Sequence, residues 1–235
     1  AVYWCDDSKI VVVGDEQMPS MRFLGTDGAR MMGSDGEPYE AEVQWDGRYS
    51  DHWLVDARSG ERSQVLTKHR GSVTSSPGGR YLLWFNKDYH WISMDVATGE
   101  QRDLTGDLHV PFHRWDDDHP SPDSAYGVAG WSANDAAVLI YDEYDLWKVS
   151  PKSGRAVCVT DGYGREHHLQ LRLQRMPRAD DSIWLPDELL LSARDVETMA
   201  TGFYADSLHR SQKPAKLWMV DKAISGLTSP TKSTR

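Results

Sequence analysis

The sequence predicts an all-β fold made of repeated four-stranded antiparallel meanders. Short apolar, β-branched runs of about five residues alternate with turns rich in Asp, Asn, Pro, Ser and Gly. The clearest example lies in residues 126–162, and residues 71–106 repeat the same order of strands and turns. A meander that repeats every 30–40 residues or so, with insertions, is typical of β-propeller blades. We therefore expect a partial propeller with about four blades.

Two landmarks place the clearest repeats in nearly the same register. Ser132 follows Ser76 by 56 residues, and Gly154 follows Gly99 by 55 residues, so the turns of the two units coincide. A third copy carries an Asp-x-x-x-Gly-Glu turn at Asp56–Glu61. The strands expected in these and a looser fourth copy are Tyr49–Val55, Tyr81–Phe85, Ala137–Tyr141, Leu146–Val149, Ala156–Thr160, Glu188–Ala193, Thr201–Ala205 and Lys216–Val220.

The repeats divide residues 1–235 into parts of one propeller region. Blade-like units are expected at 49–70, 71–106, 126–162 and 187–221, after an irregular part at 1–48, with insertions at 107–125 and 163–186.

The irregular parts carry weaker strand signals. Ile10–Val13 and Met21–Leu24 read as strands, and Ala41–Trp45 is expected to form a hairpin with Tyr49–Val55 across Asp46-Gly47-Arg48. In the second insertion, leucines alternate over 169–173, which predicts a β-extension.

Composition limits the class of partner. The net charge of −10 argues against nucleic acid, because phosphate binding needs clustered Lys and Arg. No apolar run approaches the ~18 residues of a membrane helix. Residues 1–10 show no secretory signal, and the spacing of Cys5 and Cys158 matches no zinc site, although the two could pair in an oxidising compartment.

Two polar clusters are candidates for a metal site. Asp116-Asp117-Asp118-His119, together with His109 and His113, offers oxygen and nitrogen ligands. Consecutive Asp side chains point to alternate sides of an extended chain, so a solvated loop is the expected structure. Glu166-His167-His168 is similar, since adjacent His residues diverge in a strand. No metal site and no cofactor are predicted.

Carboxylates and aromatic rings supply two further hypotheses. Asp142, Glu143 and Asp145 either present carboxylates to a propeller mouth or simply form a turn at a strand end. The indole rings could form ligand platforms, but packing within and between blades is the expected role of Trp84, Trp91, Trp131 and Trp147.

Several phrases resemble the propeller domain of the prolyl oligopeptidase family of serine peptidases, which includes the dipeptidyl peptidase IV and acylaminoacyl peptidase branches. They are SSPGGRYLLWFN, DYHWISMDVATGEQRDLT, YGVAGWSANDAAVLIYDEYDLWKVSP, VTDGYGREHHLQLRL and LLLSARDVETMATGFY, within residues 49–225. The first pattern is shared with TolB-like propellers. The combination of VPF, YGVAGW and DGYGR is more typical of the peptidases.

The resemblance implies an α/β-hydrolase domain with a Gly-x-Ser-x-Gly nucleophile elbow, which this chain lacks. The nearest sequence, Gly130-Trp131-Ser132-Ala133-Asn134, has no second Gly and falls in a blade turn, so Ser132 is expected to be a turn residue. No catalytic residue is predicted, and the chain alone should be inactive.

Two function classes remain open, with a third behind them. By resemblance, the chain is a non-catalytic propeller that gates or positions peptides for a linked hydrolase domain, and the parent enzyme is periplasmic or secreted. Alternatively, it is a stand-alone propeller of the TolB or WD-repeat type that binds a protein partner. The third class is a propeller glycosidase or lyase that uses paired carboxylates, but the sequence shows no specific spacing of two carboxylates for that chemistry. Open blade edges could also support self-association.

Overall fold

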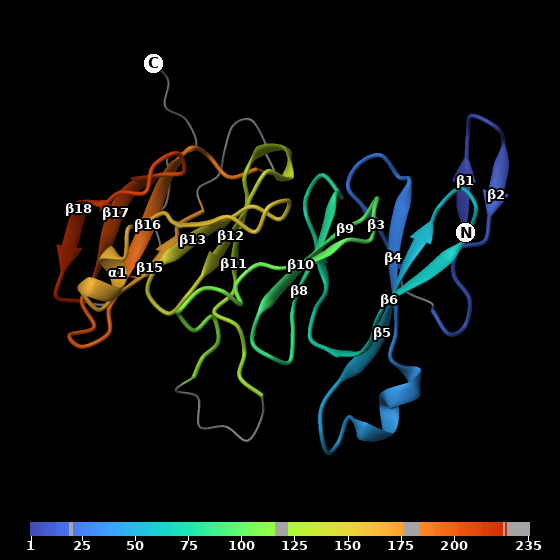
Figure 1. Ribbon diagram of the computed structural model, residues 1–235, viewed down its shortest axis with the longest axis horizontal. Helices are drawn as coiled ribbons and strands as arrows, with labels where there is room; N and C mark the ends of the chain where they lie inside the picture. Colours follow the sequence, from blue (N-terminus) through green and yellow to red (C-terminus); the bar gives the residue numbers. More distant parts are fainter. Residues whose placement is uncertain (19–20, 116–121, 176–183, 223, 225–235) are drawn as a thin grey trace. The chain divides into compact units, whose positions relative to one another are not determined.

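The computed structural model describes residues 1–18, 21–115, 122–175, 184–222 and 224. Most of these residues belong to four antiparallel sheets, each with four strands (Figure 1). The first contains β3 (Met21–Leu24), β4 (Arg30–Asp35), β5 (Tyr49–Asp56) and β6 (Arg62–Arg70). The second contains β7 (Thr74–Ser75), β8 (Tyr81–Phe85), β9 (Trp91–Asp95) and β10 (Gln101–Asp103). The third contains β11 (Val128–Trp131), β12 (Val138–Tyr141), β13 (Leu146–Val149) and β14 (Ala156–Cys158). The fourth contains β15 (Leu169–Leu173), β16 (Glu188–Asp195), β17 (Thr201–Ser207) and β18 (Ala215–Val220).

These sheets confirm the predicted all-β, propeller-type fold of meandering blades. A separate hairpin joins β1 (Val2–Trp4) to β2 (Lys9–Val11), and the helices are short: η1 (Glu37–Glu42), η2 (Ala133–Asp135) and α1 (Tyr163–Glu166). None of the helices in the described part of the chain has the length and apolar character needed to cross a membrane. The chain divides into two compact units: unit 1 comprises residues 1–106 together with Pro122, and unit 2 comprises the other described residues from Asp107 onward.

The repeated turn found in the sequence has the same hydrogen-bond pattern in three sheets. The side chain of Asp56, at the end of β5, accepts the backbone N–H groups two and three residues later, both at 2.9 Å. Asp95 and Asp195 do the same at the ends of β9 and β16. Such turns bring the chain back along the previous strand, so this aspartate sets where each hairpin reverses.

The residue four positions after the turn-starting residue adopts a positive φ. It is glycine in three blades, with φ of 79° at Gly60, 75° at Gly99 and 74° at Gly154, but methionine in the fourth, where Met199 has φ of 64°. A left-handed conformation costs an L-residue about 1–2 kcal/mol, whereas glycine adopts it freely. The fourth hairpin therefore carries local strain that the others avoid.

We expect Met199→Gly to stabilise unit 2 by about 0.5–1 kcal/mol, because it removes this left-handed penalty from an exposed position. Urea unfolding of the two proteins measures the difference. The control is Glu197→Gly in the same turn, where φ is not positive and the side chain pairs with His168 at 2.9 Å. That change should be destabilising, so a gain in both variants would contradict the explanation.

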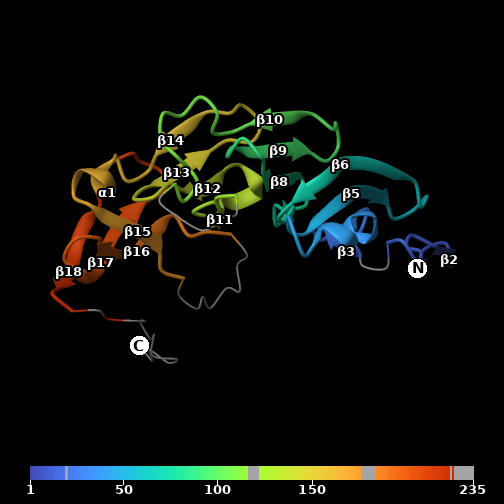
Figure 2. The same cartoon turned by 90° about the horizontal axis from the view of Figure 1, so that it is seen from below.

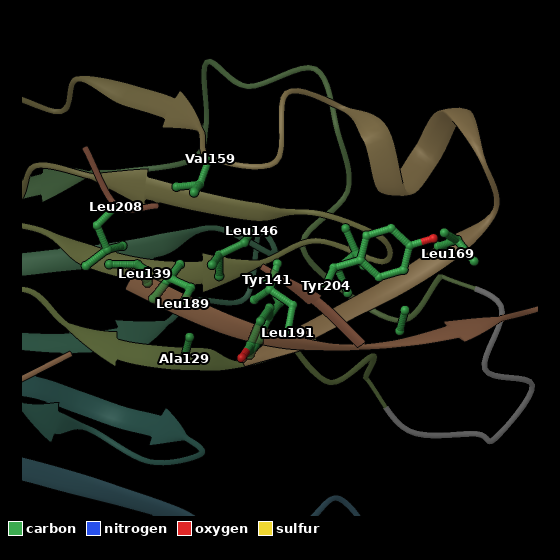
Figure 3. Close-up of a cluster of buried hydrophobic side chains, with 12 residues drawn as sticks. Ala129, Leu139, Tyr141, Leu146, Val159, Leu169, Leu189, Leu191, Tyr204 and Leu208 are labelled. Carbon is green, nitrogen blue, oxygen red and sulfur yellow. The ribbon is translucent and has the colours of Figure 1, made fainter. Parts of the chain in front are cut away.

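The core of unit 2 lies between its two sheets. Figures 1 and 2 show β12 and β13 beside β15 and β16, and side chains from both sheets pack together there. Leu139, Leu146, Leu171 and Leu191 are completely buried in this cluster. In Figure 3, Val159 and Leu208 lie at one end of the cluster, and Tyr204 and Leu169 lie at the other.

The core of unit 1 follows the same plan. Leu24, Met32 and Leu54 of the first sheet pack with Leu82 and Trp84 of the second. A smaller cluster around Val11, Met31 and Val55 lies toward the β1–β2 hairpin.

Two turns of unit 1 approach each other through glycines. A Cβ atom added at Gly79 would lie 2.6 Å from the backbone nitrogen of Gly25, and one added at Gly25 would lie 2.5 Å from the carbonyl oxygen of Gly78. Gly79 also has a positive φ of 76°. The β3–β4 and β7–β8 turns can be this close only because neither glycine has a side chain.

Three expectations about boundaries were wrong. Residues 41–45 do not pair with β5, because Glu37–Glu42 form the 3-10 helix η1, which has Pro38 in its first turn, and β5 pairs with β4 instead. The boundary expected after residue 48 therefore falls inside the first sheet. Leu169–Leu173, expected as an extension within an insertion, is the first strand of the fourth sheet.

Candidate functional site

Two carboxylates, Asp142 and Asp145, are buried in the turn between β12 and β13, with 0% and 1% exposed. The Oδ1 atom of Asp142 accepts the backbone N–H groups of Tyr144 and Asp145, both at 2.7 Å. Its Oδ2 atom accepts the indole N–H of Trp147 at 2.9 Å and the guanidinium of Arg165 at 3.1 Å. Asp142 is therefore saturated with donors.

Asp145 connects the turn to the one-turn helix α1. Its Oδ1 atom accepts the hydroxyl of Thr160 at 2.7 Å and the N–H of Gly164 at 2.8 Å, and its Oδ2 atom accepts the N–H of Arg165 at 3.1 Å. Burial raises the pKa of Asp145, although these hydrogen bonds act in the opposite direction. In place of solvent, the carboxylate thus accepts hydrogen bonds from Thr160, which follows β14, and from two residues of α1.

The cation Arg172, on β15, completes this polar cluster. Its guanidinium donates to the backbone oxygens of Asp142 at 3.1 Å and Glu143 at 2.9 Å, and lies 4.7 Å from the ring centre of Tyr141. Burial lowers the pKa of Arg172. Asp142 and Asp145 thus face inward and hold the turn, so the hypothesis that they present carboxylates to a propeller mouth is wrong.

His167 and His168 contact different partners, as expected for adjacent histidines, but they follow α1 instead of lying in a strand, and His167 Nε2 also lies 4.0 Å from Glu166 Oε2. Glu166 pairs with Lys213 at 2.9 Å, the His167 ring packs on Tyr163 at 4.2 Å, and His168 pairs with Glu197 at 2.9 Å. The three side chains do not share a ligand position.

The first insertion is described only in part. His113 pairs with Asp123 at 3.7 Å, whereas Asp116–His119 lie outside the described residues. Within the ranges that the structure describes, no three His, Cys, Asp or Glu side chains come together as a metal site. Cys5 and Cys158 are free thiols, and burial raises the pKa of Cys158 to about 11.

Ser132 and the tryptophans have the structural roles predicted for them. Ser132 immediately precedes η2, and its hydroxyl oxygen accepts the N–H of Ala137 at 3.0 Å, which is the position of a turn residue. Trp84, Trp91 and Trp131 are at most 8% exposed. Trp147 donates to Asp142 and packs edge-on against Phe112. None of these four rings forms a flat exposed platform.

Unit 2 contains a cavity of about 750 Å³ that sequence reasoning missed. It lies where the β11–β12 and β13–β14 turns meet the residues that precede β16 and the β17–β18 turn. Its lining residues are Ser132, Ala133, Ala136, Ala137, Lys148, Ser150, Ser153, Arg155, Val157, Val159, Asp187, Leu208, His209, Arg210 and Ser211. The volume is within the ~300–1,000 Å³ of small-molecule sites.

The cavity has a cationic rim and an apolar floor. Lys148, Arg155 and Arg210 line it, and no carboxylate in the described residues pairs with any of them. Asp187, the acidic residue of the lining, is paired with His209 at 3.0 Å. The lining therefore carries an excess of positive charge, whereas the whole chain has a net charge of −10.

Asp206, on β17 near this cavity, is a buried carboxylate with an unsatisfied oxygen. The residue is 2% exposed, and its Oδ2 atom has no hydrogen-bond partner within the described chain. Burial is the main cause that raises the pKa of Asp206 to about 6, and the nearby Glu188 adds to it. The folded state therefore binds a proton that the unfolded state releases at lower pH.

We expect the free energy of unfolding of unit 2 to fall by about 2 kcal/mol as the pH rises from 4 to 7 through the Asp206 carboxyl. The sign follows because the folded pKa of about 6 exceeds the unfolded value, so the native state binds more protons in this range. Asp206→Asn should remove this loss, measured by urea unfolding at pH 4, 5.5 and 7. Asp221→Asn, at an exposed position, is the control and should leave the slope unchanged.

Unit 1 has a buried imidazole pair with the opposite pH response. His52 is 6% exposed, neither of its ring nitrogens has a partner in the described residues, and its ring centre lies 5.7 Å from that of His69. Burial lowers the pKa of His52 to about 4, and the His69 and Arg22 charges act in the same direction.

We therefore expect unit 1 to lose about 2 kcal/mol of stability as the pH falls from 6.5 to 4, because the unfolded state binds the proton more strongly. His52→Leu should flatten this part of the stability curve in thermal unfolding at a series of pH values. His109→Leu, at an exposed position, should not. Equal effects of both changes would exclude burial as the cause.

Comparison with known proteins identifies similar folds. No protein-family model matches the chain, and none of the curated proteins matches it. Among solved structures, dipeptidyl peptidase 4 from Porphyromonas gingivalis is 13% identical with a TM-score of 0.54, over 87% of this chain and 33% of that one. The β-propeller domain of the Trilobed protease from Pyrococcus furiosus is 11% identical (TM-score 0.44, 86% and 58%). Acylaminoacyl peptidase from Pyrococcus horikoshii is 10% identical (TM-score 0.42, 82% and 31%).

These similarities concern the fold. The first shows that this chain has the fold of a propeller region, at an identity too low to carry residues over. The chain spans less than two thirds of the length of each of the three structures.

Proposed function

We propose that the chain is the non-catalytic propeller portion of a serine peptidase of the prolyl oligopeptidase family. The observation that carries the proposal is the similarity to Porphyromonas gingivalis dipeptidyl peptidase 4, which extends over 87% of this chain but only 33% of that protein. The part of such a protein that this chain does not cover is long enough to contain a hydrolase domain. In the present chain, Ser132 is a turn residue and no Gly-x-Ser-x-Gly elbow occurs.

In this role the propeller gates or positions peptides for chemistry carried out elsewhere. A rigid wall of meandering sheets excludes long or folded chains and bulk water from a neighbouring active site. The hydrolase domain would perform acyl transfer through a serine activated by histidine and aspartate.

The first test is the reading frame beyond Arg235. We expect further blades and then Gly-x-Ser-x-Gly, followed by Asp and His. A fluorophosphonate probe should label the full-length protein and leave residues 1–235 alone unlabelled. A frame that ends without a hydrolase segment would contradict the proposal and favour a stand-alone interaction propeller.

Gating is tested on the full-length enzyme. We expect chromogenic dipeptide or tripeptide substrates to be cleaved at least a hundredfold more efficiently, in kcat/KM, than an unfolded chain of about 50 residues with the same cleavage site. Equal efficiencies would show a peptidase without a size gate, and would leave only the family part of the proposal standing.

A further inference from the structure

The donors that line the unit 2 cavity outnumber its acceptors. Lys148, Arg155 and Arg210 supply three cationic groups. Lys148 already donates to the backbone oxygen of Leu208 at 2.5 Å, but an ammonium group has two further hydrogens to donate. The side chains of Arg155 and Arg210 make no hydrogen bond or ion pair in the described residues, and both residues are exposed.

Three serine hydroxyls add to this surplus. The hydroxyl oxygens of Ser132, Ser150 and Ser153 each accept a backbone N–H, at 3.0, 3.3 and 3.3 Å. Within the described chain, none of these hydroxyls donates its own hydrogen to a protein acceptor. A hydroxyl whose oxygen accepts one bond still has one hydrogen to donate. The lining therefore offers hydrogens from serine, lysine and arginine side chains at one location.

Side-chain acceptors are fewer. One oxygen of the exposed Asp187 carboxylate pairs with His209 at 3.0 Å, and the hydroxyl of Ser211 donates to the carbonyl oxygen of Cys158 at 2.7 Å. The remaining floor is apolar, formed largely by Val157, Val159 and Leu208. Donors around an apolar floor complement a molecule that has several acceptor oxygens and a carbon framework.

We propose that this cavity binds a small organic anion, with carboxylate or phosphate oxygens facing Arg155, Arg210 and the serine hydroxyls, and its carbon framework against Val157 and Val159. Hydrogen bonds between cationic groups and anionic oxygens are the strong ones, and guanidinium groups match both carboxylate and phosphate geometry. The inference does not depend on the proposed function, because it concerns a site inside unit 2 alone.

The test uses the 235-residue chain labelled with nitrogen-15 and three probes. Citrate represents carboxylates, phenyl phosphate represents phosphates, and glycerol is the neutral control. We expect citrate, phenyl phosphate or both to shift the amide signals of residues 150–155 and 208–212 saturably at millimolar concentration or below, with no saturable shift from glycerol. The better probe identifies the source of the anionic oxygens. Saturable shifts from neither anion, or shifts centred elsewhere, would overturn the proposal.

Matched variants separate a specific site from general charge attraction. R155Q/R210Q removes two cations whose side chains hold no other part of the protein, so it should fold normally and weaken binding at least tenfold. Lys152→Gln changes an exposed cation of the same turn that does not line the cavity and should change the affinity less than twofold. Equal losses in both variants, or no loss in the double variant, would reject the site.

Discussion

Replacing Asp145 by alanine should destabilise unit 2 by about 3–5 kcal/mol. The substitution leaves the Thr160 hydroxyl and the N–H groups of Gly164 and Arg165 without their acceptor, and a buried donor without a partner costs about 1–3 kcal/mol. The loss exceeds what the smaller side-chain volume alone would cause. Urea unfolding followed by far-ultraviolet circular dichroism measures it.

Glu143→Ala is the matched control in the same turn. The Glu143 side chain accepts one hydrogen bond, from the exposed indole of Trp115 at 3.2 Å, so its removal should cost less than about 1 kcal/mol. Asp145→Asn keeps an acceptor for Thr160 and should fall between the two alanine variants. A similar loss for Asp145→Ala and Glu143→Ala would mean that the buried carboxylate contributes no more than an exposed one.

Replacing Gly79 by alanine should destabilise unit 1 by about 2–4 kcal/mol. The added Cβ would stand 2.6 Å from the nitrogen of Gly25 and 2.7 Å from the carbonyl carbon of Leu24, which are backbone atoms that cannot rotate away. The left-handed φ of 76° adds about 1–2 kcal/mol. Thermal or urea unfolding gives the difference from the unmodified protein.

Gly99→Ala isolates the backbone part of this effect, so the difference between the two alanine variants gives the steric part. Gly99 has φ of 75°, almost the same as Gly79, but a Cβ added there would meet nothing within 4 Å. We expect a loss of about 1–2 kcal/mol from the backbone conformation alone. If both alanine variants lose the same stability, the two turns of unit 1 are not held together as closely as described.

Local sequence signals were sufficient to predict most strands. Tyr81–Phe85 is a buried apolar run between a Ser-Pro-Gly-Gly turn and a polar turn, and it forms β8 with those limits. The turns at Asp56, Asp95 and Asp195 were recognisable because an aspartate that caps its own turn acts over only three residues. Such interactions depend only on neighbouring residues, so the sequence predicts them without knowledge of the tertiary structure.

The errors arose where tertiary pairing decided the outcome. Residues 41–45 have an alternating pattern that suits a strand, but Pro38 lies in the first turn of η1, and β4 provides the partner for β5. Leu169–Leu173 was recognised as extended, yet its place as the first strand of the fourth sheet depends on pairing with β16, about twenty residues later.

The candidate site was harder to predict. Its cationic rim combines Lys148 and Arg155 with Arg210, which is more than fifty residues away in the sequence, and no local pattern connects them. The burial of Asp145 could not be predicted either, because its hydrogen bond from the N–H group of Gly164 forms only in the tertiary structure. The sequence did contain one signal of this cluster. Two aspartates flank Glu143-Tyr144, and two arginines, Arg165 and Arg172, follow within thirty residues. Such opposite charges in neighbouring repeats are the groups that can pair when the repeats pack together.

The link between Asp145 and α1 has a consequence for the motions of the native protein. A helix of four residues is far too short to persist by itself, and the amides of such a turn would normally exchange their hydrogens with solvent within moments. In α1, the N–H groups of Gly164 and Arg165 point to a buried carboxylate that belongs to the β12–β13 hairpin. We therefore expect these two amides to exchange with deuterium more slowly than those of a free turn, and Asp145→Ala to remove this protection.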